Sequence, residues 1–269
     1  MTVAGSLLLA WQVKDKPCLV VGGGNVAVSR IEHLLRANGN ITVISGTGNV
    51  DVAIIAWANE GKIKLFQRDF QVSDLTMYHT SVDGSVNGLK PENITEDHYR
   101  AIDDLVSQRF AIVCTCIDDY DLSLKIYYQC KLLQLPVNIA DKPKYCDFYF
   151  GAMYNRDNLQ IMVSTNGKSP RLSKVVKDTI AKQFDDLDLN KAVENLGALR
   201  SGLRAIVTNE DLESIDVRMN WIKDLTDFFT LRQWSELELS QESVNNVLKY
   251  FPNYPPRDIE EFKKVLSQN

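Results

Sequence analysis

Apolar residues in the first quarter of the chain alternate between short continuous runs and stretches spaced as on one face of a helix. The continuous runs are residues 17–21, 41–45 and 62–66. Between the first two runs, Val28, Ile31 and Leu34 follow the period of an amphipathic helix. Residues 50–59 predict a second helix. Strands and helices in strict alternation indicate a parallel sheet with crossover helices.

Two further strands are expected after a less regular segment. Residues 68–97 carry many turn residues and no period, most clearly at 81–88, and we interpret them as a surface insertion. A helix over 98–108, a strand over 110–115, a helix ending at 133 and a strand over 136–140 are predicted next. Asp119 or Asp121 is the expected cap of the second of these helices.

The pattern changes beyond residue 145. Residues 148–154 and 159–165 predict two antiparallel strands joined by a polar turn. Ser169 and Pro170 have the residue types of an N-cap and a first helical position, and nearly everything that follows predicts helix. Breaks are expected near residues 185–188, 209–210 and 252–256.

These elements predict an α/β protein of three parts. We expect a Rossmann-like parallel sheet domain over 1–145, a small α+β dimerisation region over 146–188 and a helical C-terminal domain over 189–269. The strands and helix of 148–184 are too few to enclose a core alone, which favours a homodimer.

Composition narrows the class of protein. The net charge of −5 and pI of about 5.3 argue against a general nucleic-acid binder. No apolar run approaches the roughly 20 residues that span a bilayer, so no membrane partner is expected. Residues 6–11 are too short for a signal peptide, and we interpret them as a segment that docks on the core. Five cysteines, three of them (Cys18, Cys114 and Cys116) in apolar runs, indicate reduced thiols in a cytoplasmic protein.

A glycine-rich turn carries the first functional signal. Gly22, Gly24 and Ala27 match the G-x-G-x-x-G/A fingerprint, and they follow a strand and open a helix as dinucleotide binding requires. The alternative is a structural glycine turn without a cofactor. The predicted cofactor-binding residues come from this turn and from the ends of the second and fourth strands: Gly22, Gly23, Gly24, Asn25, Val26, Ser45, Gly46, Thr47, Thr115 and Cys116.

The acid that commonly ends the second strand and binds the ribose 2′-hydroxyl is missing. That strand ends in Ser45, Gly46 and Thr47, and the next acid along the chain is Asp51. No arginine stands there to accept a 2′-phosphate either. These residues therefore leave open whether the dinucleotide is NAD or NADP.

Asp141 follows the fifth predicted strand, at the sheet edge where ligands bind in open α/β folds. A carboxylate there can accept a proton from a substrate beside the nicotinamide. The alternative is a loop aspartate that caps a turn or pairs with Lys142.

Several motifs together resemble the precorrin-2 dehydrogenase/sirohydrochlorin ferrochelatase family, in its fungal branch. The resemblance runs in order from about residue 6 to about residue 230. It rests on residues 20–27 (VVGGGNVA), 57–61 (WANEG), 137–143 (VNIADKP), 146–152 (CDFYFGA) and 164–171 (STNGKSPR).

The resemblance implies NAD-dependent oxidation of precorrin-2, followed by insertion of Fe²⁺ as a substrate to give siroheme. It places the family's catalytic aspartate on Asp141 and, from bacterial members, a phosphorylatable serine on Ser169. As an N-cap, Ser169 needs no such role. It also implies a homodimer and a tetrapyrrole polycarboxylate substrate. The candidate substrate-binding residues are Lys142, Lys168, Ser169, Arg171, Arg200 and Arg204, with Lys144 as a further basic residue near them in sequence.

The sequence offers no metal motif, since it lacks C-x-x-C and H-E-x-x-H spacing, and the last of its three histidines is His98. Chelation is therefore a weaker expectation than oxidation. Two alternatives stay open. One is a dehydrogenase alone, with another protein inserting the metal. The other is a dinucleotide-sensing module without catalysis, in which Asp141 is structural.

Overall fold

The computed structural model describes residues 5–48, 50–80, 86 and 88–267. The chain forms two compact units, Met1–Tyr149 and Phe150–Asn269. The predicted α/β class is confirmed, with a parallel sheet in the first unit and mostly helices in the second. Among the described residues, no helix is long and apolar enough to cross a membrane.

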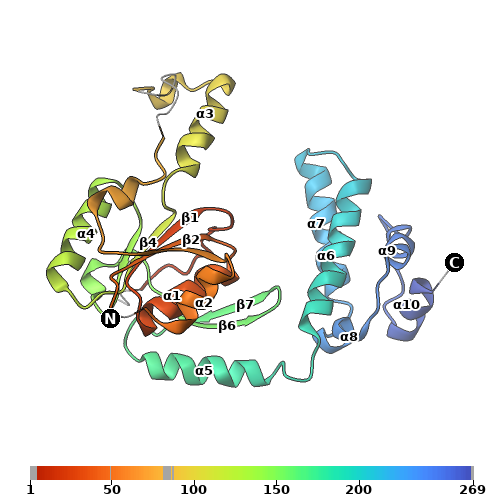
Figure 1. Ribbon diagram of the computed structural model, residues 1–269. Coiled ribbons are helices and arrows are strands. Elements are labelled where there is room, and N and C mark those ends of the chain that lie inside the picture. The colour runs from red at the N-terminus through yellow and green to blue at the C-terminus, as the bar shows by residue number, and fades with distance from the viewer. Residues whose placement is uncertain (1–4, 49, 81–85, 87, 268–269) are drawn as a thin grey trace. The chain divides into compact units, whose positions relative to one another are not determined.

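A five-stranded parallel sheet forms the centre of the first unit (Figure 1). Its strands stand in the order β3-β2-β1-β4-β5, so the direction of winding reverses between β1 and β4. Ligands of such folds bind at this reversal point, beyond the carboxyl ends of the strands. The strands are β1 (Pro17–Val21), β2 (Asn40–Ser45), β3 (Ile63–Gln67), β4 (Ile112–Thr115) and β5 (Val137–Ile139).

Four helices accompany the sheet, and α3 extends away from the strands (Figure 1). No described residue of α3 is buried, whereas α1 buries Ala27, Ile31 and Leu34. Asp119 is the cap of α4, because its carboxylate accepts from the Leu122 N–H at 2.9 Å. The helices are α1 (Asn25–Arg36), α2 (Val52–Asn59), α3 (Glu96–Ser107) and α4 (Tyr120–Leu132).

The segment predicted as a surface insertion is partly buried, which corrects that expectation. Its described residues include the 3-10 helices η1 (Val72–Thr76) and η3 (Pro91–Asn93). Leu75 is fully buried in the sheet core, and Asp74 is nearly so. Arg68 donates two hydrogen bonds, of 2.9 and 2.6 Å, to the Asp74 carboxylate. Most of the predicted turn-rich stretch at 81–88 lies outside the described residues.

The prediction that residues 6–11 dock on the core is wrong. Leu7, Leu9 and Trp11 are 80%, 66% and 56% exposed. Leu9 and Trp11 instead line a shallow pocket of about 460 Å³ beside Lys16 and Pro136. None of residues 6–11 belongs to the hydrophobic cluster formed by the strands, α4 and Leu75.

The second unit begins with a hairpin and continues as helices. Strands β6 (Ala152–Arg156) and β7 (Leu159–Val163) pair antiparallel, so the turn is shorter than predicted. Ser169 caps the next helix as expected, accepting from the Leu172 N–H. The helices are α5 (Pro170–Lys182), α6 (Leu189–Ile206), α7 (Leu212–Thr226), α8 (Leu231–Glu236), α9 (Gln241–Leu248) and α10 (Ile259–Leu266).

The core of the second unit is aromatic. Trp234, Phe229 and Phe262 pack edge to face with ring centroids 4.8 to 6.2 Å apart. Trp221 stacks on Tyr254 and donates through its indole N–H to the Asn253 carbonyl at 2.7 Å. These rings come from α7, α8, α10 and the chain between them, so the C-terminal helices form one packed body.

Candidate functional site at the carboxyl edge of the sheet

The turn after β1 lies against the end of β4. Gly22 has a φ of +120°, and a Cβ atom added there would lie 2.2 Å from the carbonyl oxygen of Cys116. The Cys116 N–H donates to Val21 O at 2.7 Å, and the Gly22 N–H donates to Ile44 O at 2.8 Å. Only glycine satisfies both the backbone conformation and this close approach.

The other residues of the turn open toward solvent. Gly22 and Gly23 are buried, whereas Gly24, Asn25 and Val26 are exposed. A Cβ added at Gly24 would meet no atom within 4 Å. Helix α1 starts at Asn25 with no side-chain cap and no acid in its first turn. Its first N–H groups are therefore free to meet an anion, and the turn fits the pyrophosphate of a dinucleotide.

Asp141 shares this edge with the glycine turn, and Cys116 links the two. The Ala140 N–H donates to Thr115 O at 2.9 Å, which brings the end of β5 beside that of β4. Burial raises the pKa of the Cys116 thiol to about 12; the charge of Arg30 lowers this pKa and that of Asp141 raises it. The end of β5, from which Asp141 follows, and the Gly22 turn therefore both lie against the end of β4.

The Asp141 carboxylate is exposed and accepts no hydrogen bond from any described residue. Its φ of +58° is a left-handed conformation that aspartate tolerates better than most residues. It forms no ion pair with Lys142 in the described part of the chain; the Lys142 ammonium lies over the Tyr120 ring instead, 5.3 Å from the ring centre. The two alternative interpretations of Asp141 were a turn cap and an ion pair with Lys142. No contact of a described residue supports either one.

The backbone of the loop that carries Asp141 is held by hydrogen bonds from side chains that follow it in sequence. The Cys146 thiol donates to the carbonyls of Ile139 and Lys142 at 3.1 and 3.3 Å. Burial is the main reason that the pKa of this thiol is raised, so it stays protonated as a donor. Tyr149 donates its hydroxyl to the Pro143 carbonyl at 2.9 Å. These contacts hold the backbone of residues 139–143 and leave the Asp141 side chain free.

The remaining predicted cofactor residues lie at the ends of β2 and β4. Ser45 is buried, Gly46 half-buried and Thr47 exposed. Thr115 is fully buried, and its hydroxyl oxygen has no hydrogen-bond partner among the described residues. Asp69, which the sequence did not single out, places a carboxylate oxygen 3.1 Å from the Cβ position of Gly46. The two residues are distant in sequence, so only the pairing of β2 with β3 brings them together.

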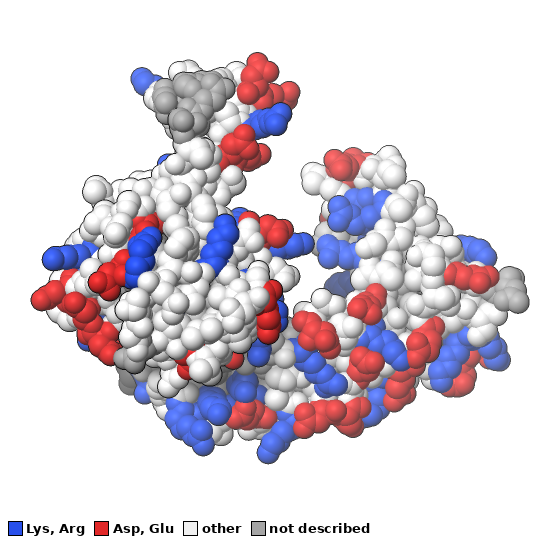
Figure 2. All heavy atoms as spheres, in the orientation of Figure 1, with Lys and Arg blue, Asp and Glu red and all other residues white. Residues whose placement is uncertain are grey.

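The predicted substrate-binding residues divide between the units. Lys142 belongs to the first unit, and Lys168, Ser169, Arg171, Arg200 and Arg204 belong to the second. Arg200 and Arg204 are four residues apart on α6 and both exposed. None of the five cations forms an ion pair with a described residue. Figure 2 shows basic and acidic side chains interspersed on the face it draws.

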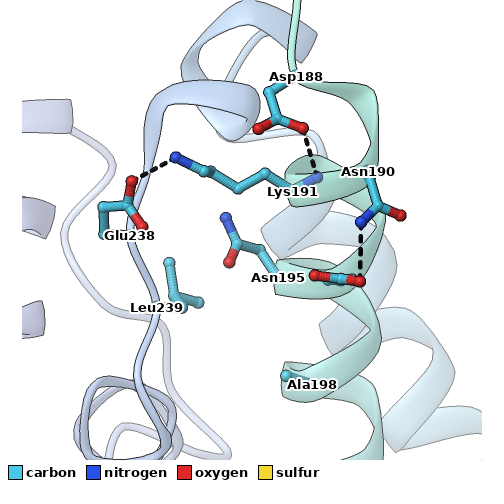
Figure 3. A pocket seen from close by; sticks show the side chains of 8 residues that line it. Asp188, Asn190, Lys191, Asn195, Ala198, Glu238 and Leu239 are labelled. Carbon is cyan, nitrogen blue, oxygen red and sulfur yellow. Dashed lines mark hydrogen bonds and ion pairs between the residues drawn. The ribbon is translucent and has the colours of Figure 1, made fainter. Parts of the chain in front are cut away.

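The second unit also holds a polar pocket of about 310 Å³ that the sequence did not predict (Figure 3). Lys191 crosses it to pair with Glu238, and Asn190 donates to Glu194 at 2.9 Å. Buried Asn195 donates to the carbonyls of Trp234 and Leu237. The polar side chains Lys191, Asn190 and Asn195 are thus engaged within this pocket and join α6 to the chain after α8. It contains none of the predicted site residues.

Family models match most of the chain. A model described as putative NAD(P)-binding covers residues 9–152. Models described as sirohaem biosynthesis protein central and C-terminal cover residues 156–183 and 187–255.

Two fungal relatives match along nearly the whole chain. A siroheme biosynthesis protein of Schizosaccharomyces pombe is 34% identical over 252 residues, which is 94% of this chain and 82% of that protein. A siroheme biosynthesis protein of Saccharomyces cerevisiae is 35% identical over 245 residues, 88% of each chain. Among solved structures, SirC, a precorrin-2 dehydrogenase, has the same fold. Its TM-score is 0.51 at 19% identity, over 84% of this chain and 94% of that one.

Proposed function

The chain belongs to the precorrin-2 dehydrogenase/sirohydrochlorin ferrochelatase family of siroheme biosynthesis proteins, and on that premise we propose that it oxidises precorrin-2 to sirohydrochlorin with NAD. The observation that carries the proposal is the exposed, unpaired Asp141 carboxylate at the same sheet edge as the Gly22 turn. A base and a dinucleotide site side by side are what a dehydrogenation requires.

The oxidation removes a hydride and a proton from the macrocycle. NAD, when bound, supplies the hydride acceptor. Gly22 and Gly24 let the backbone approach the pyrophosphate, and the start of α1 faces its charge. Asp141 accepts the proton on a carboxylate oxygen that has no hydrogen-bond or ion-pair partner among the described residues. The backbone of its loop, fixed by Cys146 and Tyr149, keeps that oxygen in place as the proton transfers.

Insertion of Fe²⁺ into sirohydrochlorin is the second step of the proposal. Metallation requires the pyrrole N–H groups to lose their protons, and a carboxylate beside the ring can accept them. Asp141 is the residue we assign to this task. The described residues hold no group of three or more histidine, cysteine and acidic side chains placed as metal ligands. In this proposal the Fe²⁺ substrate contacts only the macrocycle and Asp141.

We assign the carboxylates of the substrate to the unpaired cations. Lys142 lies next to Asp141, and Lys168 and Arg171 flank the start of α5. Arg200 and Arg204 present two guanidinium groups on one exposed face of α6. Guanidinium groups bind carboxylates in bidentate fashion, which suits a substrate with many acid groups.

We also propose that the chain is a homodimer formed through residues 146–188. In this proposal a dinucleotide-binding domain over 1–145 precedes the dimerisation region in sequence, and a helical domain over 189–269 follows it. Leu172, Val175 and Val176 are 51%, 45% and 38% exposed and share one face of α5, since they are three and four residues apart. An apolar stripe of this kind is stabilised by burial against a second copy.

The test is a two-stage assay. Purified protein is incubated with precorrin-2 and NAD, NADH is followed by its absorbance, and Fe²⁺ is then added while the tetrapyrrole spectrum is recorded. We expect NADH first and metallated product second. NADH without metallation would leave a dehydrogenase whose product another protein metallates. NAD binding without any NADH would contradict catalysis and favour a dinucleotide-sensing module.

A further inference from the structure

The end of β2 lacks the acid that dinucleotide-binding sheets commonly place there. Its last residues are buried Ser45, then Gly46 and Thr47, none of which carries a charge. A ribose with two hydroxyls that binds at this strand end would find no carboxylate from β2. A carboxylate acceptor at this strand end must therefore come from another part of the chain.

The neighbouring strand brings a carboxylate to this position. Strands β2 and β3 are parallel, and Ser45 lies opposite Gln67. Both chains leave the sheet at the same edge, Gly46 directly after β2 and Asp69 two residues after β3. Asp69 Oδ1 lies 3.1 Å from the point at which a side chain of residue 46 would begin. Glycine at 46 leaves that space to the Asp69 carboxylate.

The Asp69 carboxylate is also free to accept. The adjacent cation, Arg68, is occupied: it donates two hydrogen bonds to Asp74 and one, at 3.0 Å, to the backbone carbonyl of Asp69. No described side chain forms a hydrogen bond or ion pair with the Asp69 carboxylate, and the residue is exposed. Its negative charge is therefore not neutralised by a partner.

We propose that Asp69, at the exit of β3, takes the place of the missing β2 acid: it accepts from the 2′-hydroxyl of the adenosine ribose of NAD and excludes NADP. An unneutralised carboxylate gains a charge-assisted hydrogen bond from a hydroxyl and repels a phosphate at the same site. The inference rests on the dinucleotide binding of the proposed function, and it adds the residue that selects between the two cofactors.

The test is a set of binding titrations by calorimetry, without substrate. Wild-type protein, Asp69→Asn and Asp69→Ala are titrated with NAD, with NADP and with the NAD analogue that lacks the adenosine 2′-hydroxyl. Asp15→Asn is the matched control in the same unit. It removes an exposed carboxylate just before β1, whereas Asp69 lies just after β3 at the carboxyl edge of the sheet. Asp69 is exposed, so its variants should unfold at the wild-type temperature.

We expect wild-type protein to prefer NAD, and Asp69→Ala to lose about tenfold or more in affinity for NAD. In Asp69→Asn the preference for NAD over NADP should narrow by a similar factor, because the repulsion of the 2′-phosphate is gone. The deoxy analogue should bind wild-type protein weakly, and its affinity should fall no further in Asp69→Ala.

Two results would overturn the inference while leaving the cofactor assignment intact: a wild-type protein that binds NAD and NADP equally, or an Asp69→Asn variant with the wild-type preference. A wild-type protein that binds neither dinucleotide would overturn both the cofactor assignment and the role of Asp69.

Discussion

Gly22 and Cys116 touch through backbone alone: the Cβ position of Gly22 lies 2.2 Å from the Cys116 carbonyl oxygen. The first and fourth strands thus leave the sheet in direct contact, at the point where the winding reverses. We predict that Gly22→Ala loses about 3 kcal/mol of stability, from the clash and from a φ of +120° that alanine avoids. Thermal unfolding should begin about 10 °C lower. An unchanged unfolding temperature would contradict the close approach.

Gly24 should behave differently, because a side chain there enters open space. Gly24→Asp is expected to fold as the wild type does and to lose at least about tenfold in NAD affinity, since it places a negative charge where the pyrophosphate binds. Calorimetric titration with NAD measures this. Gly24→Ala is the control that separates the size of the side chain from its charge, and full NAD affinity in Gly24→Asp would refute the placement of the turn.

Asp141→Asn is expected to lower the rate of precorrin-2 oxidation by about 10² or more, the range for loss of a general base. NAD affinity should stay within about twofold, because we assign Asp141 to the substrate and not to the dinucleotide. Asparagine tolerates the left-handed backbone at 141, so the loop should keep its shape. Asp15→Asn, at a φ of +60°, is the matched control. Normal turnover by Asp141→Asn would remove it from catalysis.

The ion pair between Arg68 and buried Asp74 gives a pH dependence of stability. Burial alone raises the pKa of the Asp74 carboxyl, but hydrogen bonds from Arg68 and from the Gln71 N–H outweigh it and hold the pKa below its usual value. The stabilisation is therefore present at neutral pH and is lost as the pH falls below about 4 and through the folded-state pKa.

Asp74→Asn should cost about 2 kcal/mol at pH 7, measured by urea unfolding. The difference between wild type and variant should shrink at pH 3, because the wild-type carboxyl is then protonated in the unfolded state and increasingly in the folded state. A difference that is equal at both pH values would show that the charge of Asp74 contributes nothing.

The apolar face of α5 gives a prediction about assembly. Val175→Glu places a charge in the stripe it shares with Leu172 and Val176, and we expect the dimer to dissociate into folded monomers. Sedimentation velocity measures the change. Leu212→Glu on α7, where the leucine is 81% exposed, is the control and should remain dimeric. A wild-type protein that sediments as a monomer would contradict the dimer itself.

Local pattern alone determined much of this protein. The run at 17–21, the glycines after it and the helical spacing from Val28 to Leu34 predicted β1, the turn and α1, because each depends on neighbours a few residues away. The position of Asp141 after the last parallel strand followed in the same way. The choice between Asp119 and Asp121 as cap required the hydrogen bond to the Leu122 N–H.

Contacts between distant positions were decided only by the tertiary structure. Leu75 is buried in the sheet core next to Asp74, which Arg68 binds, whereas Leu7, Leu9 and Trp11 are exposed. Asp69 lies beside Gly46 because β2 pairs in parallel with β3 and Ser45 lies opposite Gln67. The spacing of apolar residues indicates which face of a strand is buried. The partner and register of that strand depend on the packing of the whole sheet.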